Sequence, residues 1–278
     1  MDQINFKQER DLGATLQDAS TFIKQHFGRI MKPTLIVVAI PLVLGTVLMV
    51  TGTLDMYSNM GSNDPSQVLS SFWTLLPSYF IIMLAYILAS IVYIGYIKLY
   101  DEGVEDITLN DLVPILKSKW LSLTLSAIVL VIVIYIGMIL CLLPGIYLSI
   151  VFAHFFVISI IEEVGFGTSW NRSFFLIKDN WWSTFGLYIV TYLISLGIMM
   201  LVYIPVYAIM GVSIFSAAKE NDPALMAESM SNMAYITPLY YVAGLVISLL
   251  FSVVTSLRYF SLVEKKEGSG EREQINKL

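Results

Sequence analysis

His154 is the residue of this sequence best suited to proton chemistry, and it lies inside an apolar stretch at residues 145–161. An imidazole can exchange a proton near neutral pH, and an ionisable residue within a long apolar segment is a candidate functional group. No Asp, Glu or Lys lies in the same stretch, so a proton relay would lack partners. We therefore expect a neutral imidazole that hydrogen-bonds to a neighbouring helix, with a functional His154 as the alternative.

Two adjacent carboxylates, Glu162 and Glu163, follow this stretch and could serve acid–base chemistry. Neighbouring residues of a helix point about 100° apart, which argues against a shared site. We expect instead a solvated helix end in which the glutamates form an ion pair with Arg172. Arg258 either extends its charge to the lipid headgroups or pairs with the same glutamates.

The sequence has few residues suited to metal, redox or nucleotide chemistry. The chain has two histidines and the single Cys141, which excludes an intrachain disulfide and a multi-cysteine metal site. We predict no catalytic residue, no metal, no cofactor and no nucleic-acid partner.

The composition indicates that the solvent of this chain is lipid. Of its 278 residues, 57% are hydrophobic and only 13% are charged, about half the charged fraction of soluble domains. A membrane helix needs about 20 apolar residues, and paired backbone groups favour helices over strands. We predict an all-α membrane protein with six spans, at residues 34–51, 79–100, 121–143, 145–161, 184–204 and 239–263.

The basic residues predict the orientation of these spans. Fifteen of the sixteen Lys and Arg residues flank the spans on one side, and Lys219 alone lies on the other. Because basic loops stay in the cytoplasm, we expect both termini there.

Three segments share one spacing, which predicts an internal repeat. In each, a hydroxyl residue is followed nine positions later by a lysine and then by an aromatic residue: Thr15, Lys24 and Phe27; Thr108, Lys117 and Trp120; Ser169, Lys178 and Trp181. The hydroxyl can cap a helix, and the aromatic residue suits the headgroup level. We predict one domain at residues 1–263, built from repeats at about 12–104, 105–163 and 165–263, and a polar cytoplasmic tail at 264–278.

Each repeat is interpreted as an interfacial elbow helix followed by a transmembrane hairpin. Lys24, Lys117 and Lys178 are then candidates for contact with lipid headgroups, arranged as a ring if the repeats surround a pseudo-threefold axis. Ordinary positive-inside anchoring is the alternative. Pro144 and Pro205 both follow the repeat lysine by 27 residues, so we expect each to end a span, with a tight turn at Pro144-Gly145.

One region resembles a known family. Leu143-Pro144-Gly145-Ile146-Tyr147, followed by Asn171-Arg172-Ser173-Phe174-Phe175-Leu176-Ile177-Lys178 and Trp181-Trp182, resembles the membrane domain of some bacterial glycerophosphodiester phosphodiesterases and its stand-alone relatives. The likeness is clearest over residues 105–200. It implies a bacterial inner-membrane protein linked to lipids. The catalytic domain of those enzymes has no counterpart in these residues, so we expect no enzyme activity.

These observations favour a non-enzymatic multi-pass protein that acts as an accessory or scaffold in envelope or lipid homeostasis. Membrane lipids are the expected partners, and a protein partner or a homo-oligomer stays open. The alternative is a transporter or permease subunit for a small or lipid-like substrate, because transporters often contain internal repeats. A water-filled cavity that reaches His154 would favour transport, and an enclosed bundle would favour the scaffold.

The topology predicts which positions a membrane-impermeant thiol reagent reaches in intact cells. Single cysteines near positions 60 and 225, on a Cys141→Ala background, should be labelled. Cysteines near 105, 170 and 270 should be labelled only after the membrane is opened. Labelling near position 270 in intact cells would contradict the assigned orientation.

Overall fold

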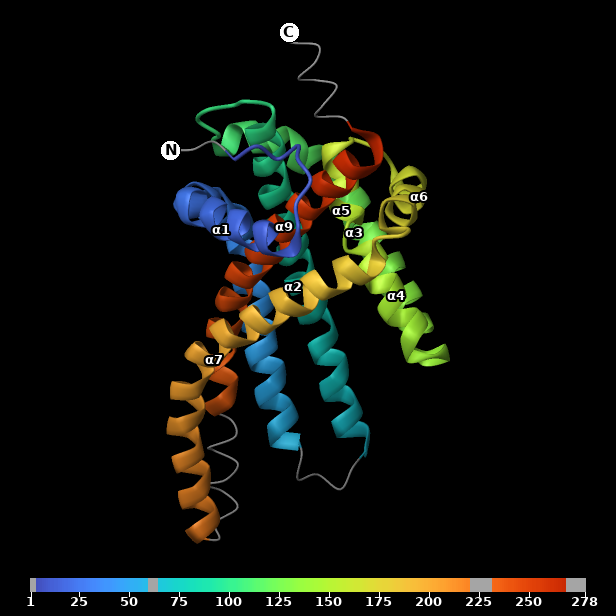
Figure 1. Cartoon of the computed structure of the whole chain (residues 1–278). Coiled ribbons are helices and arrows are strands. Elements are labelled where there is room, and N and C mark those ends of the chain that lie inside the picture. Colours follow the sequence, from blue (N-terminus) through green and yellow to red (C-terminus); the bar gives the residue numbers. More distant parts are fainter. Residues whose placement is uncertain (1–3, 60–64, 221–231, 269–278) are drawn as a thin grey trace. The chain divides into compact units, whose positions relative to one another are not determined.

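The computed structural model describes residues 4–59, 65–220 and 232–268, and every regular element among them is helical. Figure 1 shows the arrangement along the chain. The helices are α1 (Leu12–Asn59), α2 (Pro65–Asp101), α3 (Leu109–Leu140), α4 (Leu142–Phe152), α5 (Phe155–Ile161), α6 (Phe166–Ile177), α7 (Trp181–Glu220), the short 3₁₀ helix η1 (Met233–Ile236) and α9 (Thr237–Glu267).

Six segments of the described residues are long and apolar enough to cross a membrane, which confirms the predicted all-α class and the predicted spans. They are Leu12–Met56, Phe72–Asp101, Leu109–Leu140, Leu142–Ile161, Trp181–Ile204 and Ala234–Glu267. The fourth combines α4 and α5, which are separated at Ala153 and His154. The chain therefore has the elements of a multi-pass membrane protein.

Two compact units divide the chain. Unit 1 comprises Met1–Ile36, Ile87–Tyr192 and Ser248–Leu278, and unit 2 comprises Val37–Tyr86 and Leu193–Ile247. Their boundaries differ from those of the predicted repeats at 12–104, 105–163 and 165–263. The threefold arrangement remains a prediction. The end of α9 at Glu267 also means that residues 264–267, assigned to the tail from sequence, are helical, while 269–278 lie outside the described residues.

Only one of the three expected elbow segments is a separate helix. α1 and α3 each continue without a break from the expected elbow into the span, whereas α6 is a distinct helix of 12 residues. Of the three hydroxyl residues of the repeat pattern, only Thr108 stands at a helix start. Thr108 precedes α3, and both its N–H and its hydroxyl donate to Asp111, at 2.8 and 2.7 Å. α1 begins one turn before Thr15, where Asp11 accepts from Ala14 N–H at 2.7 Å.

Aromatic residues of α6 pack against α4 within unit 1. The rings of Trp170 and Phe174 pack against Phe152 of α4, with centroid separations of 4.4 and 5.5 Å. Trp181 at the start of α7 stacks on Tyr147 of α4 at 5.9 Å. Residues that recur along one helix face thus attach α6 to the fourth span.

The turn between α3 and α4 lies at Cys141, three residues before the predicted Pro144-Gly145 turn. Cys141 has extended backbone angles, with φ −167° and ψ 139°, and α4 starts at the next residue. Pro144 falls in the first turn of α4, where a missing N–H costs no helical hydrogen bond. Pro205 directly follows the fifth candidate span, Trp181–Ile204, as expected, but it does not end the helix, because α7 continues to Glu220. Neighbouring groups in membrane proteins can compensate for a proline inside a helix.

Glycines allow α3 and α4 to lie side by side (Figure 1). A Cβ on Gly137 would lie 3.2 Å from the Cα of Gly145. A Cβ on Gly145 would lie 2.8 and 2.9 Å from the backbone N and Cα of Met138, closer than real Cβ contacts. The hairpin therefore depends on backbone approach at these positions, as small residues permit in membrane helix pairs.

The core of unit 2 is built where α1 meets α2. Met49, Leu75 and Ile82 are buried together, with Met56, Tyr86 and Tyr241 packed against them. Gly45 of α1 packs closely against Ile82 of α2, and Gly52 packs closely against Leu75. The Tyr86 hydroxyl donates to the carbonyl of Tyr241 at 3.0 Å, which joins α2 to α9 within this unit.

Replacing Gly145 by Ala should destabilise the protein by about 1–3 kcal/mol, because the new methyl group meets backbone atoms. Gly186→Ala in α7 is the matched control. A Cβ there has nothing within 4 Å, so this change should be neutral or slightly stabilising. Thermal unfolding of both variants in detergent tests the packing, and equal midpoints for the two variants would contradict it.

Candidate functional site

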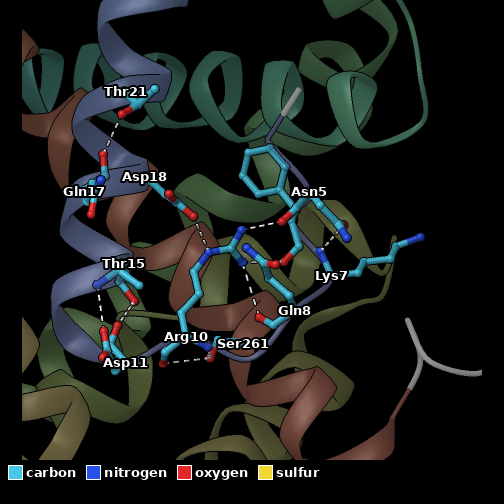
Figure 2. Close-up of polar contacts among 12 residues, drawn as sticks. Asn5, Lys7, Gln8, Arg10, Asp11, Thr15, Gln17, Asp18, Thr21 and Ser261 are labelled. Atoms are coloured by element: carbon cyan, nitrogen blue, oxygen red, sulfur yellow. Dashed lines mark hydrogen bonds and ion pairs between the residues drawn. The ribbon is translucent and has the colours of Figure 1, made fainter. Parts of the chain in front are cut away.

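Arg10 anchors the N-terminal segment, residues 5–10, to unit 1 (Figure 2). Its side chain is 1% exposed and forms an ion pair with Asp18 of α1 at 2.8 Å. The remaining guanidinium donors bind backbone carbonyls of its own segment: Phe6 at 2.8 Å, Gln8 at 3.3 Å, and Asn5. Its backbone N–H donates to Ser261 of α9 at 2.9 Å, and the Ser261 hydroxyl also reaches the Arg10 carbonyl at 3.3 Å.

Phe6 fixes the same segment by aromatic packing. It is almost fully buried, and its ring centroid lies 5.4 Å from Phe22, 5.7 Å from Tyr100 and 5.3 Å from Phe260. These partners belong to α1, α2 and α9. Sequence analysis counted Arg10 only as a cytoplasmic charge and gave Phe6 no role, since an isolated aromatic residue before a helix carries no periodic signal.

His154 is fully buried at the junction of α4 and α5. Its Nε2 lies 3.4 Å from the hydroxyl of Tyr188 on α7. That hydroxyl donates to Thr255 Oγ1 on α9 at 3.2 Å, which leaves its oxygen free to accept from Nε2–H. Nδ1 is near the Ile150 carbonyl but has no partner with hydrogen-bond geometry among the described residues. His154 therefore contacts a neighbouring helix, as the sequence suggested.

Arg258 does not pair with the glutamates, contrary to one of its two expected roles. It is buried, and its Nε donates to Thr184 at 3.1 Å and its Nη2 to Ser183 at 2.6 Å. Both hydroxyl residues belong to the first turn of α7. Arg258 follows Thr255 by one turn of α9. Its guanidinium therefore lies beside the hydrogen bonds that link His154, Tyr188 and Thr255, and its own partners are neutral oxygens.

Arg172, in the middle of α6, is the centre of an ion-pair cluster that also includes the ends of α5 and α9. Its Nε donates to Glu162 at 2.9 Å, so the predicted pair is present, and Nη2 donates to Glu267 at 3.0 Å while Nη1 contacts the same carboxylate. The Tyr259 hydroxyl also donates to Glu162, at 2.9 Å. The hydrogen bond to Glu267 raises the pKa of Arg172 further above its ordinary value, so its charge is permanent.

Glu163 has a different partner from Glu162, but it lies beyond the end of α5, so the helical separation of about 100° does not explain the difference. It contacts Lys98 of α2, and this hydrogen bond lowers the pKa of the Glu163 carboxyl. Its φ of 56° shows that the chain reverses here after the helix. The two glutamates therefore do not share an acid–base site.

Lys24, Lys117 and Lys178 are all exposed on unit 1. Exposure leaves the ammonium groups available to headgroups, while the proposed ring remains a prediction. Near the last of them, Lys266 donates to the carbonyl of Lys178 at 2.9 Å, and Lys265 donates to Asn180 at 2.8 Å. The end of α9 is thus attached to the loop between α6 and α7.

Within residues 4–59, 65–220 and 232–268, no group of three His, Cys, Asp or Glu side chains is placed to hold a metal ion. Comparison of the chain with protein-family models, curated proteins and solved structures finds no match.

Arg172→Lys should lower the stability of unit 1 by about 1–2 kcal/mol, because lysine cannot reproduce the forked contacts with two carboxylates. Because Arg172 and its two carboxylate partners are partly exposed, screening by solvent limits the loss of stability. Arg29→Lys is the matched control, since Arg29 makes a single exposed ion pair with Asp106. A double-mutant cycle with Glu267→Gln measures the coupling, and zero coupling would show that the cluster adds nothing to stability.

Proposed function

We propose that this protein is a non-enzymatic inner-membrane protein that acts as an accessory or scaffold in envelope or lipid homeostasis. The observation that carries the proposal is the full burial of His154, whose polar contacts are to side chains of the same unit. A site that binds a solute or a substrate would instead offer such groups to a water-accessible space.

Contacts near the end of α9 support the same proposal. Arg10 attaches residues 5–10 to α9, and Arg172 attaches α6 to the end of α9. Contacts of this kind hold helix ends together, which suits a protein that presents a fixed surface. The lipid part of the proposal rests on the resemblance of residues 105–200 to a membrane domain found with glycerophosphodiester phosphodiesterases.

A transporter is the second candidate, and one observation favours it. The buried Arg258 lies close to His154 of the fourth span and is bound by hydroxyl partners. Ionisable residues inside membrane spans often mark solute or ion pathways. Water access to His154 distinguishes the two functions.

Cysteine accessibility tests the enclosed network. In proteoliposomes, a cysteine at position 154 on a Cys141→Ala background should resist a small water-soluble thiol reagent, whereas Glu163→Cys, at an exposed position, should react quickly. The reagent should be applied from both sides. Reaction at 154 at a rate comparable to that at 163 would favour the transporter.

The cellular role needs a separate measurement. Loss of the protein from its host should change the envelope lipid composition, and His154→Gln should restore it, because an amide can keep one hydrogen bond to Tyr188. Failure of His154→Gln, with normal abundance of the folded protein, would indicate that a titratable imidazole is required.

A further inference from the structure

A cavity on unit 1 combines positive charge with an apolar wall. Its volume is about 340 Å³, within the range of small-molecule sites. It lies between the middle of α1 and the segment that leads into α3. Its lining residues are Arg29, Lys32, Pro33, Ile36, Asp106, Ile107, Thr108 and Leu109.

The charges of this cavity favour an anion. Arg29 and Lys32 face one carboxylate, Asp106, so the lining carries a net charge of one positive unit. The Arg29–Asp106 pair is long, at 3.7 Å, and its side chains are 59% and 90% exposed. Such a pair is weak and can rearrange. In the part of the chain that the structure describes, Lys32 has no ion-pair or hydrogen-bond partner of its own.

The apolar residues of the cavity favour an amphiphile over a free ion. Pro33 and Ile107 of the lining are buried, and Ile36 is 64% exposed at the start of the first apolar run. The two basic residues therefore lie just before the start of the hydrophobic span. This is the level of the bilayer at which lipid phosphates meet acyl chains. The N–H and the hydroxyl of Thr108 already donate to Asp111, so these two groups are not donors to a ligand in the cavity.

We propose that this cavity binds an anionic glycerophospholipid, with the phosphate between Arg29 and Lys32 and an acyl chain along Ile36. The proposal deepens the lipid role proposed above by assigning a site and a lipid class. It also differs from the predicted ring of Lys24, Lys117 and Lys178, because it uses another pair of cations and an apolar wall. An occupied cavity would fix α1 to the segment before α3.

The test is retention of lipid by purified full-length protein. Protein from nanodiscs of equal parts phosphatidylglycerol and phosphatidylethanolamine is released into the gas phase, and bound lipids are counted by native mass spectrometry. Wild type should retain phosphatidylglycerol preferentially. R29Q/K32Q should reduce that retention by about five- to tenfold, given the attraction of each cation for anionic lipid and its screening by salt.

Two further variants separate a site from general attraction. K265Q/K266Q removes the same charge from the end of α9, outside the cavity, and should change retention by less than about twofold. Leu109→Trp narrows the cavity without changing any charge and should reduce retention as R29Q/K32Q does. Equal losses in R29Q/K32Q and K265Q/K266Q, or no loss in Leu109→Trp, would overturn the site.

Competition distinguishes the two sources of phosphate. Excess inorganic phosphate should not displace phosphatidylglycerol from wild type, because it makes no contact with Ile36. Full displacement, or equal retention of phosphatidylethanolamine, would overturn the assignment to an anionic lipid. These results are independent of the cellular test: a strain with unchanged envelope lipids would contradict the proposed function and leave a measured lipid site in place.

Discussion

A charge removed from water must meet a partner inside the protein, and this constraint organises unit 1. Arg10, Arg172 and Arg258 are each withdrawn from solvent to a different degree, and each is bound by oxygens from its surroundings. Arg10 uses a carboxylate and its own backbone, Arg172 uses two carboxylates, and Arg258 uses hydroxyls. Because these oxygens come from several helices, satisfying each guanidinium also determines which helix ends lie together.

Long patterns in the sequence were sufficient to predict the elements. Six apolar runs gave the six spans. The four-residue spacing of Trp170 and Phe174 also agrees with their common place on the face of α6 that packs on α4. Such features depend on many residues at once, so a local exception changes little. The contact between Glu162 and Arg172 was also predictable, since both lie near one turn of the chain and carry opposite charges.

Single-residue signals were less informative, for identifiable physical reasons. Pro205 directly follows the fifth apolar span but does not end its helix, because a membrane helix can continue through proline. Thr15 was expected to cap α1, yet Asp11 lies one turn earlier and is the stronger local acceptor. The partners of Arg10 and Arg258 are set by contacts between distant segments, which no local spacing encodes. The cavity at Arg29 and Lys32 was missed for the same reason, because its other wall comes from residues 106–109.

The attachment of Arg10 to Ser261 joins residues that are 251 positions apart. By contrast, α3 and α4 are joined by the single residue Cys141 and can pair as soon as both have been synthesised. During translation, residues 5–10 are made well before α9, so Phe6 can pack on Phe22 of α1 and Tyr100 of α2 first. The contacts with Phe260 and Ser261 form only once α9 has been made. Docking of the segment therefore proceeds in two steps, and a chain that stops before α9 lacks the second.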